Sequence, residues 1–242
     1  MPHAHIRTVT HATRALPVLI AALAAACSDA TTAPATENVT ISMATATATA
    51  ATAGATLAPP ITGNGHTLTL GGLALTIGDL RLERSGHTGA DDHRVGDDDL
   101  LFASGLTTVT LPVDGGIVTL SARDVAAGTY AQVKAELVSL RVSGSYDNTA
   151  FDATVELSHD LELALNPPLT TTGGGAQNVT VTIDFSSCFT DASGTPVDPR
   201  TLRSGSNPAR DTFRECIAGK LRAFEDRNRD GHDTGDDHRS ND

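Results

Sequence analysis

Hydrophobic and polar residues alternate with a period of two along most of the chain after residue 60. Leu68 and Leu70 alternate with threonines, and Val179 and Val181 do the same further along the chain. Because successive side chains of a strand point to opposite faces, this alternation is typical of strands with one buried face. The pattern predicts about eight strands between residues 61 and 185. No helical pattern separates them, which favours a mainly β protein with a single antiparallel β-sandwich.

Breaks in the alternation predict where strands bend or turn. Gly78-Asp79 separates two runs of opposite phase and predicts a β-bulge. Asp114-Gly115-Gly116 predicts a hairpin turn, with Val118 in the returning strand. His159 stands at an apolar position, which a bend around it explains. Tyr130, which follows a turn into a strand, is expected to anchor the core.

Apolar residues near the C-terminal end recur with helical spacing. Phe213, Ile217, Leu221 and Phe224 lie at positions i, i+4, i+8 and i+11. This spacing gives a helix one apolar face. Pro208 lies just upstream, and Asp211 favours the first turn of a helix. The sequence therefore predicts one C-terminal amphipathic helix that packs against the sandwich.

The N-terminal segment has the features of an export signal. Arg7 and Arg14 precede the apolar stretch Ala15–Ala26, which is shorter than the roughly 20 residues that span a bilayer. Small residues lead directly into Cys27, and this arrangement resembles the lipobox of bacterial lipoproteins. The resemblance implies cleavage before Cys27 and attachment of lipid to its sulfur. The alternative is ordinary secretion, with Cys27 an incidental thiol.

Composition divides the rest of the chain. Residues 27–60 are rich in Ala and Thr, have few large apolar side chains and end in Pro59-Pro60, which predicts a disordered tether. The expected order is a lipoprotein signal peptide at 1–26, the tether at 27–60, the β-sandwich domain with its C-terminal helix at 61–225, and an acidic tail at 226–242.

Three short motifs follow one another in the predicted domain. Ala127-Gly128-Thr129-Tyr130 opens a strand, Leu163-Ala164-Leu165-Asn166-Pro167-Pro168 ends another, and Asn178-Val179-Thr180-Val181-Thr182-Ile183-Asp184-Phe185 comes next. With the lipobox, the tether and an acidic insert, they resemble uncharacterised bacterial lipoproteins that carry an antiparallel β-sandwich domain of unknown function. The resemblance covers most of residues 65–225. It implies an exported, surface-associated β domain and brings no catalytic residues to carry over.

Charge and composition narrow the classes of partner. Lys and Arg total 17 against 29 Asp and Glu, a net charge of -12, which argues against nucleic acid because few cations are available to neutralise phosphates. The chain has no Trp and two Tyr, Tyr130 and Tyr146. Few aromatic side chains are therefore available to stack on a sugar, which argues against a carbohydrate-binding face. Cys188 and Cys216 form an even pair in an exported protein and predict a disulfide. Such a bridge contributes about 3 to 4 kcal/mol to stability.

Two segments carry candidate metal ligands. Asp226, Asn228 and Asp230 alternate and are followed by a glycine, the arrangement that a calcium loop requires, with Asp233 and Asp237 as further ligands. Its expected affinity is of the weak extracellular kind, a Kd of about 10⁻⁴ to 10⁻³ M. A solvated acidic tail is the alternative. A weaker metal candidate, for a transition metal, comprises His87, Asp91 and His93, where the alternative is a polar loop.

These features favour a lipid-anchored protein of the cell membrane or outer membrane. Its β-sandwich is expected to be a non-enzymatic binding or structural module that contacts an envelope protein or a glycan, with no cofactor other than calcium. Two alternatives stay open. One is a calcium-dependent surface binding or adhesion protein. The other is an exported hydrolase, although no Gly-x-Ser-x-Gly motif occurs. A histidine within hydrogen-bond reach of a Ser, a Cys or a carboxylate inside a pocket would favour the hydrolase.

Overall fold

The computed structural model describes residues 35–45, 59–86, 99–113, 115–203 and 207–234. All of them belong to one of the chain's two compact units, Pro34–Asp242. The strands are β1 (Thr36–Thr45), β2 (Ile61–Gly63), β3 (His66–Arg84), β4 (Leu100–Ala103), β5 (Thr107–Leu111), β6 (Ile117–Ala126), β7 (Gly128–Tyr146), β8 (Thr149–Thr171), β9 (Ala176–Ile183) and β10 (Leu221–Glu225). The helices are the α-helix α1 (Pro208–Gly219) and two short 3₁₀ helices, η1 (Ser186–Phe189) and η2 (Pro199–Leu202).

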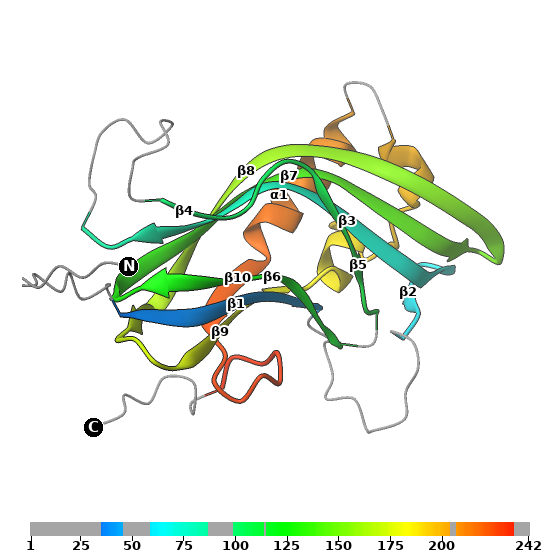
Figure 1. The fold of residues 1–242 in the computed structure, drawn as a ribbon. Helices are drawn as coiled ribbons and strands as arrows, with labels where there is room; N and C mark the ends of the chain where they lie inside the picture. Colours follow the sequence, from blue (N-terminus) through cyan, green and yellow to red (C-terminus); the bar gives the residue numbers. More distant parts are fainter. Residues whose placement is uncertain (1–34, 46–58, 87–98, 114, 204–206, 235–242) are drawn as a thin grey trace, which may run out of the picture. The chain divides into compact units, whose positions relative to one another are not determined.

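The strands form one curled sheet in the order β2-β3-β7-β8-β10-β9-β1-β6, with β4 and β5 pairing with β3 (Figure 1). The predicted mainly β class is confirmed. The sheet is not purely antiparallel, however, because β1 runs parallel to β9 and β10 runs parallel to β8. A sandwich of two separate sheets is not confirmed either, since β8 and β10 are joined through one residue pair, Leu165 and Ala223.

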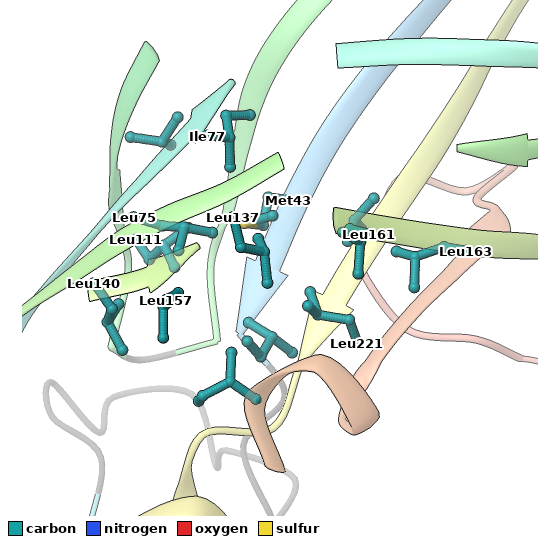
Figure 2. Packing of buried hydrophobic residues seen from close by; sticks show 14 of the residues in the cluster. Met43, Leu75, Ile77, Leu111, Leu137, Leu140, Leu157, Leu161, Leu163 and Leu221 are labelled. Atoms are coloured by element: carbon teal, nitrogen blue, oxygen red, sulfur yellow. The ribbon is translucent and has the colours of Figure 1, made fainter. Parts of the chain in front are cut away.

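The core lies on the concave side of this sheet and is built from the alternating apolar residues. The pairing divides the strands into two groups, a β8 group of β2, β3, β4, β5, β7 and β8 and a β1 group of β1, β6, β9 and β10. Leu75, Leu140 and Leu157 come from the β8 group, and Met43 and Leu221 come from the β1 group (Figure 2). All are nearly or completely buried and belong to one cluster. The side chains of both strand groups therefore share a single hydrophobic core, as the period-two pattern requires.

β1 corrects the predicted tether. Residues 36–45 are a strand between β6 and β9, and Val39, Ile41 and Met43 are buried. These three residues alternate with Thr40 and Ser42, so the period-two signal was present. The surrounding Ala and Thr composition concealed it. The folded domain therefore includes residues 36–45, which precede the predicted start at 61.

Two local turn predictions are confirmed and one is wrong. The register of β3 against β7 shifts between Gly78 and Arg81, and that of β7 against β8 shifts next to His159, so both strands contain bulges. β5 and β6 do not form a hairpin, because β5 pairs with β3 and β6 pairs with β1. The chain there crosses between the two ends of the sheet, where the Ser121 hydroxyl of β6 donates a hydrogen bond to the Phe102 carbonyl of β4 at 2.9 Å.

The C-terminal helix is confirmed but is shorter than its apolar stripe. The Asn207 side chain accepts a hydrogen bond from the Ala209 amide at 3.0 Å, which caps the start of α1. Phe213 and Ile217 are buried on this helix, whereas Leu221 and Phe224 lie in β10. The helix ends at Gly219 because the next residues pair with β9.

A disulfide joins α1 to η1, the short helix that follows β9. Cys188 on η1 and Cys216 on α1 are bonded with an S–S distance of 2.02 Å, as predicted. Tyr130 is also confirmed as a core residue, and its hydroxyl donates to the Ala126 carbonyl at 2.9 Å. α1 packs against β8, and the Phe213 ring lies 5.0 Å from that of Phe189 on η1. The helix therefore adds Phe213 and Ile217 to the hydrophobic core next to β8.

Because β1 is a central strand, truncating its core side chain is expected to destabilise the whole domain. Ile41 is completely buried, so Ile41→Ala should lower the free energy of unfolding in urea by about 3 kcal/mol, and Ile41→Val by about 1 kcal/mol. The control is Thr36→Ala, at an exposed position of the same strand, with a change within about 0.5 kcal/mol. Equal midpoints for all four proteins would show that residues 36–45 do not belong to the core.

Candidate functional site

The predicted site residues fall into three groups. Cys27, His87, Asp91, His93 and Asp237 lie outside the described residues. Cys188 and Cys216 form the disulfide. Asp226, Asn228, Asp230 and Asp233 follow β10 in one loop. Only this last group provides a candidate site whose geometry is described.

Asp226 is completely buried, although it begins the predicted acidic tail. Its amide donates to the Asn178 carbonyl at 2.8 Å, which continues the pairing of β10 with β9. Its Oδ2 accepts hydrogen bonds from the Thr180 hydroxyl at 2.8 Å and from the Gly231 amide at 3.0 Å. Its Oδ1 accepts from the Asp230 amide at 3.2 Å. These donors compensate the loss of water around a buried charge.

The carboxylate belongs to a buried polar network, which we call the Asp226 network: Ser42, Asn178, Thr180 and Asp226. The Asn178 amide nitrogen donates to the Thr180 hydroxyl at 2.9 Å and lies 3.5 Å from Asp226 Oδ2. Ser42 on β1 donates to the Asn178 side-chain oxygen at 3.0 Å. Alternation placed Asn178 and Thr180 on the polar face of β9, which predicts solvent rather than burial. Their burial could not be predicted from the nearby sequence, because Asp226, which covers them, is distant along the chain.

The loop after Asp226 holds its oxygen atoms in a tight turn. The Asn228 oxygen accepts from the Asp230 amide at 3.1 Å, and Asp230 Oδ1 accepts from the His232 amide at 2.8 Å. Arg229 and Gly231 have positive φ angles of 59° and 76°, a left-handed conformation that tight turns use. The structure therefore brings Asp226, Asn228 and Asp230 into one hydrogen-bonded loop.

Carboxylates alone do not provide enough ligands for a metal ion in this loop. Within the described ranges, no group of three or more His, Cys, Asp or Glu side chains is placed to hold a metal ion. A calcium ion here would therefore need the Asn228 amide oxygen and backbone carbonyls beside Asp226 and Asp230, which are oxygen donors that Ca²⁺ accepts. The Arg227 side chain is paired with Glu225 at 3.0 Å, so its charge is partly compensated.

A second polar cluster lies where the turn after β2 meets the turn between β7 and β8. His66 Nδ1 lies 2.6 Å from Asp147 Oδ2, and the Thr67 amide donates to Asp147 Oδ1 at 2.9 Å. The His66 ring stacks on Tyr146, whose hydroxyl donates to the Pro196 carbonyl at 3.1 Å. The hydrogen bond from His66 is the main cause that lowers the pKa of Asp147. Burial, followed by the negative charge of Asp147, raises the pKa of Tyr146.

This cluster bears on the hydrolase alternative. A histidine and the carboxylate that orients it are two of the three members of a hydrolytic triad. The side chains of His66 and Asp147 are 45% and 41% exposed, and no Ser, Thr or Cys side chain among the described residues is hydrogen-bonded to His66. The pair therefore offers a base and its orienting group on an open surface, without the nucleophile that acyl transfer needs. Sequence reasoning missed it because His66 and Asp147 are 81 residues apart.

The lowered pKa of Asp147 predicts a pH dependence of stability. A carboxyl whose pKa is depressed below its ordinary value of 3.8 stabilises the folded state above that pH, and this stabilisation is lost as the pH falls through the lowered pKa. Asp147→Asn should therefore reduce the free energy of unfolding at pH 6 more than at pH 2, in urea titrations at both values. Glu215→Gln, at an exposed helix position, is the control. A reduction for Asp147→Asn that is equal at the two pH values would contradict the assignment.

Two further findings concern membrane spans and known proteins. Among the described residues, no helix is long and apolar enough to cross a bilayer. Comparison with models of protein families, with curated proteins and with solved structures gives no match to this chain.

Proposed function

We propose that the chain is a lipid-anchored protein of the cell envelope, in the cell membrane or outer membrane, whose β domain is a non-enzymatic binding or structural module. The observation that carries the proposal is Cys27, which directly follows small residues at the end of a short apolar stretch behind Arg7 and Arg14. The chain has three cysteines, and two of them form the disulfide, which leaves Cys27 as the cysteine for lipid.

The disulfide supports export in a second way. Bridges of this kind persist in oxidising compartments and are rare in the reducing cytosol. Cys188 and Cys216 join α1 to η1 and so contribute to the fold, and neither occurs in a Cys-x-x-Cys motif. A structural bridge in the folded domain is consistent with a protein that acts outside the cytosol.

We further propose that the two strand groups act as the two layers of a sandwich. Backbone pairing joins them at Leu165–Ala223, and they share one core, which is how two sheets that pack face to face behave. The non-enzymatic assignment is supported by the exposure of His66 and Asp147, because general-base catalysis benefits from a site that excludes water. The partners that fit the proposal are an envelope protein or a glycan, together with the membrane itself.

The start of β1 limits how far the domain stands from the lipid. Ala35 is already tied to the sheet, since its carbonyl accepts from the Ala127 amide at 3.0 Å. The proposed tether therefore runs from Cys27 to Ala35 and spans at most about 30 Å when fully extended. A short tether of this kind holds the module close to the membrane surface.

Lipidation is tested by labelling the full chain with palmitate in a bacterial host. The wild-type protein should take up the label and fractionate with membranes, and Cys27→Ser should abolish both. The matched control is the double variant Cys188→Ser with Cys216→Ser, which removes the other two thiols and should keep the label. Label that persists in Cys27→Ser, or that is absent from the wild type, would refute the anchoring proposal.

A second candidate function is calcium-dependent surface binding or adhesion. The specific observation in its favour is the folded loop in which Asp226, Asn228 and Asp230 are drawn together. Asp226 Oδ1 has one hydrogen bond of 3.2 Å, and a carboxylate oxygen has room for more than one partner. In this candidate, Asp233 and Asp237 complete the oxygen set and the ion stabilises the loop.

Calcium binding is measured by calorimetry with the full chain and millimolar calcium chloride. We expect a Kd of about 10⁻⁴ to 10⁻³ M. Asp230→Asn should weaken binding at least tenfold by removing a charged ligand, whereas Asp211→Asn on α1 should leave it unchanged. A titration of the wild-type protein without heat or saturation would remove calcium from consideration, and the lipid-anchoring proposal would be unaffected.

A further inference from the structure

The outer face of β1 and β9 is covered, although it is the face away from the core. On β9, Val179 and Val181 face the core, whereas Asn178 and Thr180 alternate with them and are only 5% and 0% exposed. On β1, Ser42 is 3% exposed. Polar side chains on an outer face are normally solvated, so a further segment must lie over them.

The segment that covers them is 226–232, which we call the C-terminal strap. Asp226 bonds to Asn178 and Thr180, as described above. A side chain at Gly231 would lie 2.9 Å from Ile117 Cγ1 on β6 and 3.1 Å from Ala44 Cβ on β1. The strap therefore passes across three strands, from β9 over β1 to β6.

Burial within the strap is confined to two positions. Asp226 and Gly231 are buried, whereas residues 227–230 and His232 are exposed. The side chains of Asn228 and Asp230 bond within the strap itself. The strands beneath are held differently, by continuous backbone pairing of β1 with both β6 and β9 and by apolar residues in the core.

We propose that the C-terminal strap is a separate conformational unit, latched by the Asp226 carboxylate, that opens without unfolding of the sheet. A segment held by few buried groups opens at a lower free energy than strands that share a ladder and a core. Opening uncovers Ser42, Asn178 and Thr180, a strip of hydroxyl and amide groups on the outer face. Closure satisfies this strip with the carboxylate of Asp226.

Two variants should open the strap by different routes. Asp226→Asn keeps the side-chain shape but replaces an acceptor oxygen by an amide donor that faces the Thr180 hydroxyl and backbone amides. Gly231→Ala leaves the carboxylate intact but requires a side chain at φ +76° in contact with Ile117 and Ala44. Arg229→Gln, at an exposed position of the same segment whose side chain takes no part in the hydrogen bonds described above, is the matched control.

The experiment is amide hydrogen exchange of the full chain, with EDTA present so that no metal contributes. Asp226→Asn and Gly231→Ala should each speed exchange of the amides of residues 230–232 at least tenfold, with β1 and β9 exchanging as in the wild type. Arg229→Gln should keep wild-type exchange at the Gly231 amide. Unchanged exchange of the strap in both variants would overturn the proposal. So would a joint loss of protection in the strap, β1 and β9, because the strap would then be part of the sheet's cooperative unit.

Discussion

The fold depends on the pairing of β8 with β10, which joins the two parts of the sheet. β8 pairs with β7 over almost its whole length, but it meets β10 through Leu165 and Ala223 alone. Beyond that pair the edge of β8 has backbone groups and apolar side chains that need cover. α1 and η2 lie against β8, and the Arg203 guanidinium donates to the Asp152 carbonyl on that strand. The disulfide between Cys188 and Cys216 fixes the helix in this position, so the bridge acts where the sheet is least continuous.

Two buried carboxylates, Glu37 and Asp226, fix loop segments to β1 and β9. Glu37 on β1 is 6% exposed and accepts hydrogen bonds from the Thr172 and Gly173 amides, at 2.9 and 3.3 Å, in the turn between β8 and β9. Asp226 does the same for the segment after β10. In both cases backbone amides replace water around the charge, which makes burial of an acidic group tolerable. Part of the chain's negative charge is therefore structural. Glu37 lies on β1, the strand that the composition of residues 27–60 concealed, and Asp226 bonds to the neighbouring strand β9.

The limits of prediction follow from which interactions are local. Alternation is a local property, so strands such as the one containing Val179 and Val181 were predicted, as were the bulges at Gly78 and His159. Pairing partners are non-local, and nothing near Asp114 indicates that β5 and β6 join different ends of the sheet. Leu221 and Phe224 satisfied a helical spacing, yet pairing with β9 outweighs that preference. Asn178 and Thr180 read as solvent-facing because the carboxylate that covers them lies about 50 residues away in sequence.

The position of β1 changes how the proposed anchor acts on the domain. A tether that ended at residue 60 would attach the lipid to the edge strand β2, which has three residues and pairs with β3 alone. An attachment at Ala35 leads instead into a strand that pairs on both sides, with β6 and with β9. A pull along β1 is then opposed by two ladders at once, and the buried side chains of Val39, Ile41 and Met43 would have to leave the core before the strand could slide. Anchoring through a central strand therefore suits a module that stays folded while it is held at a membrane.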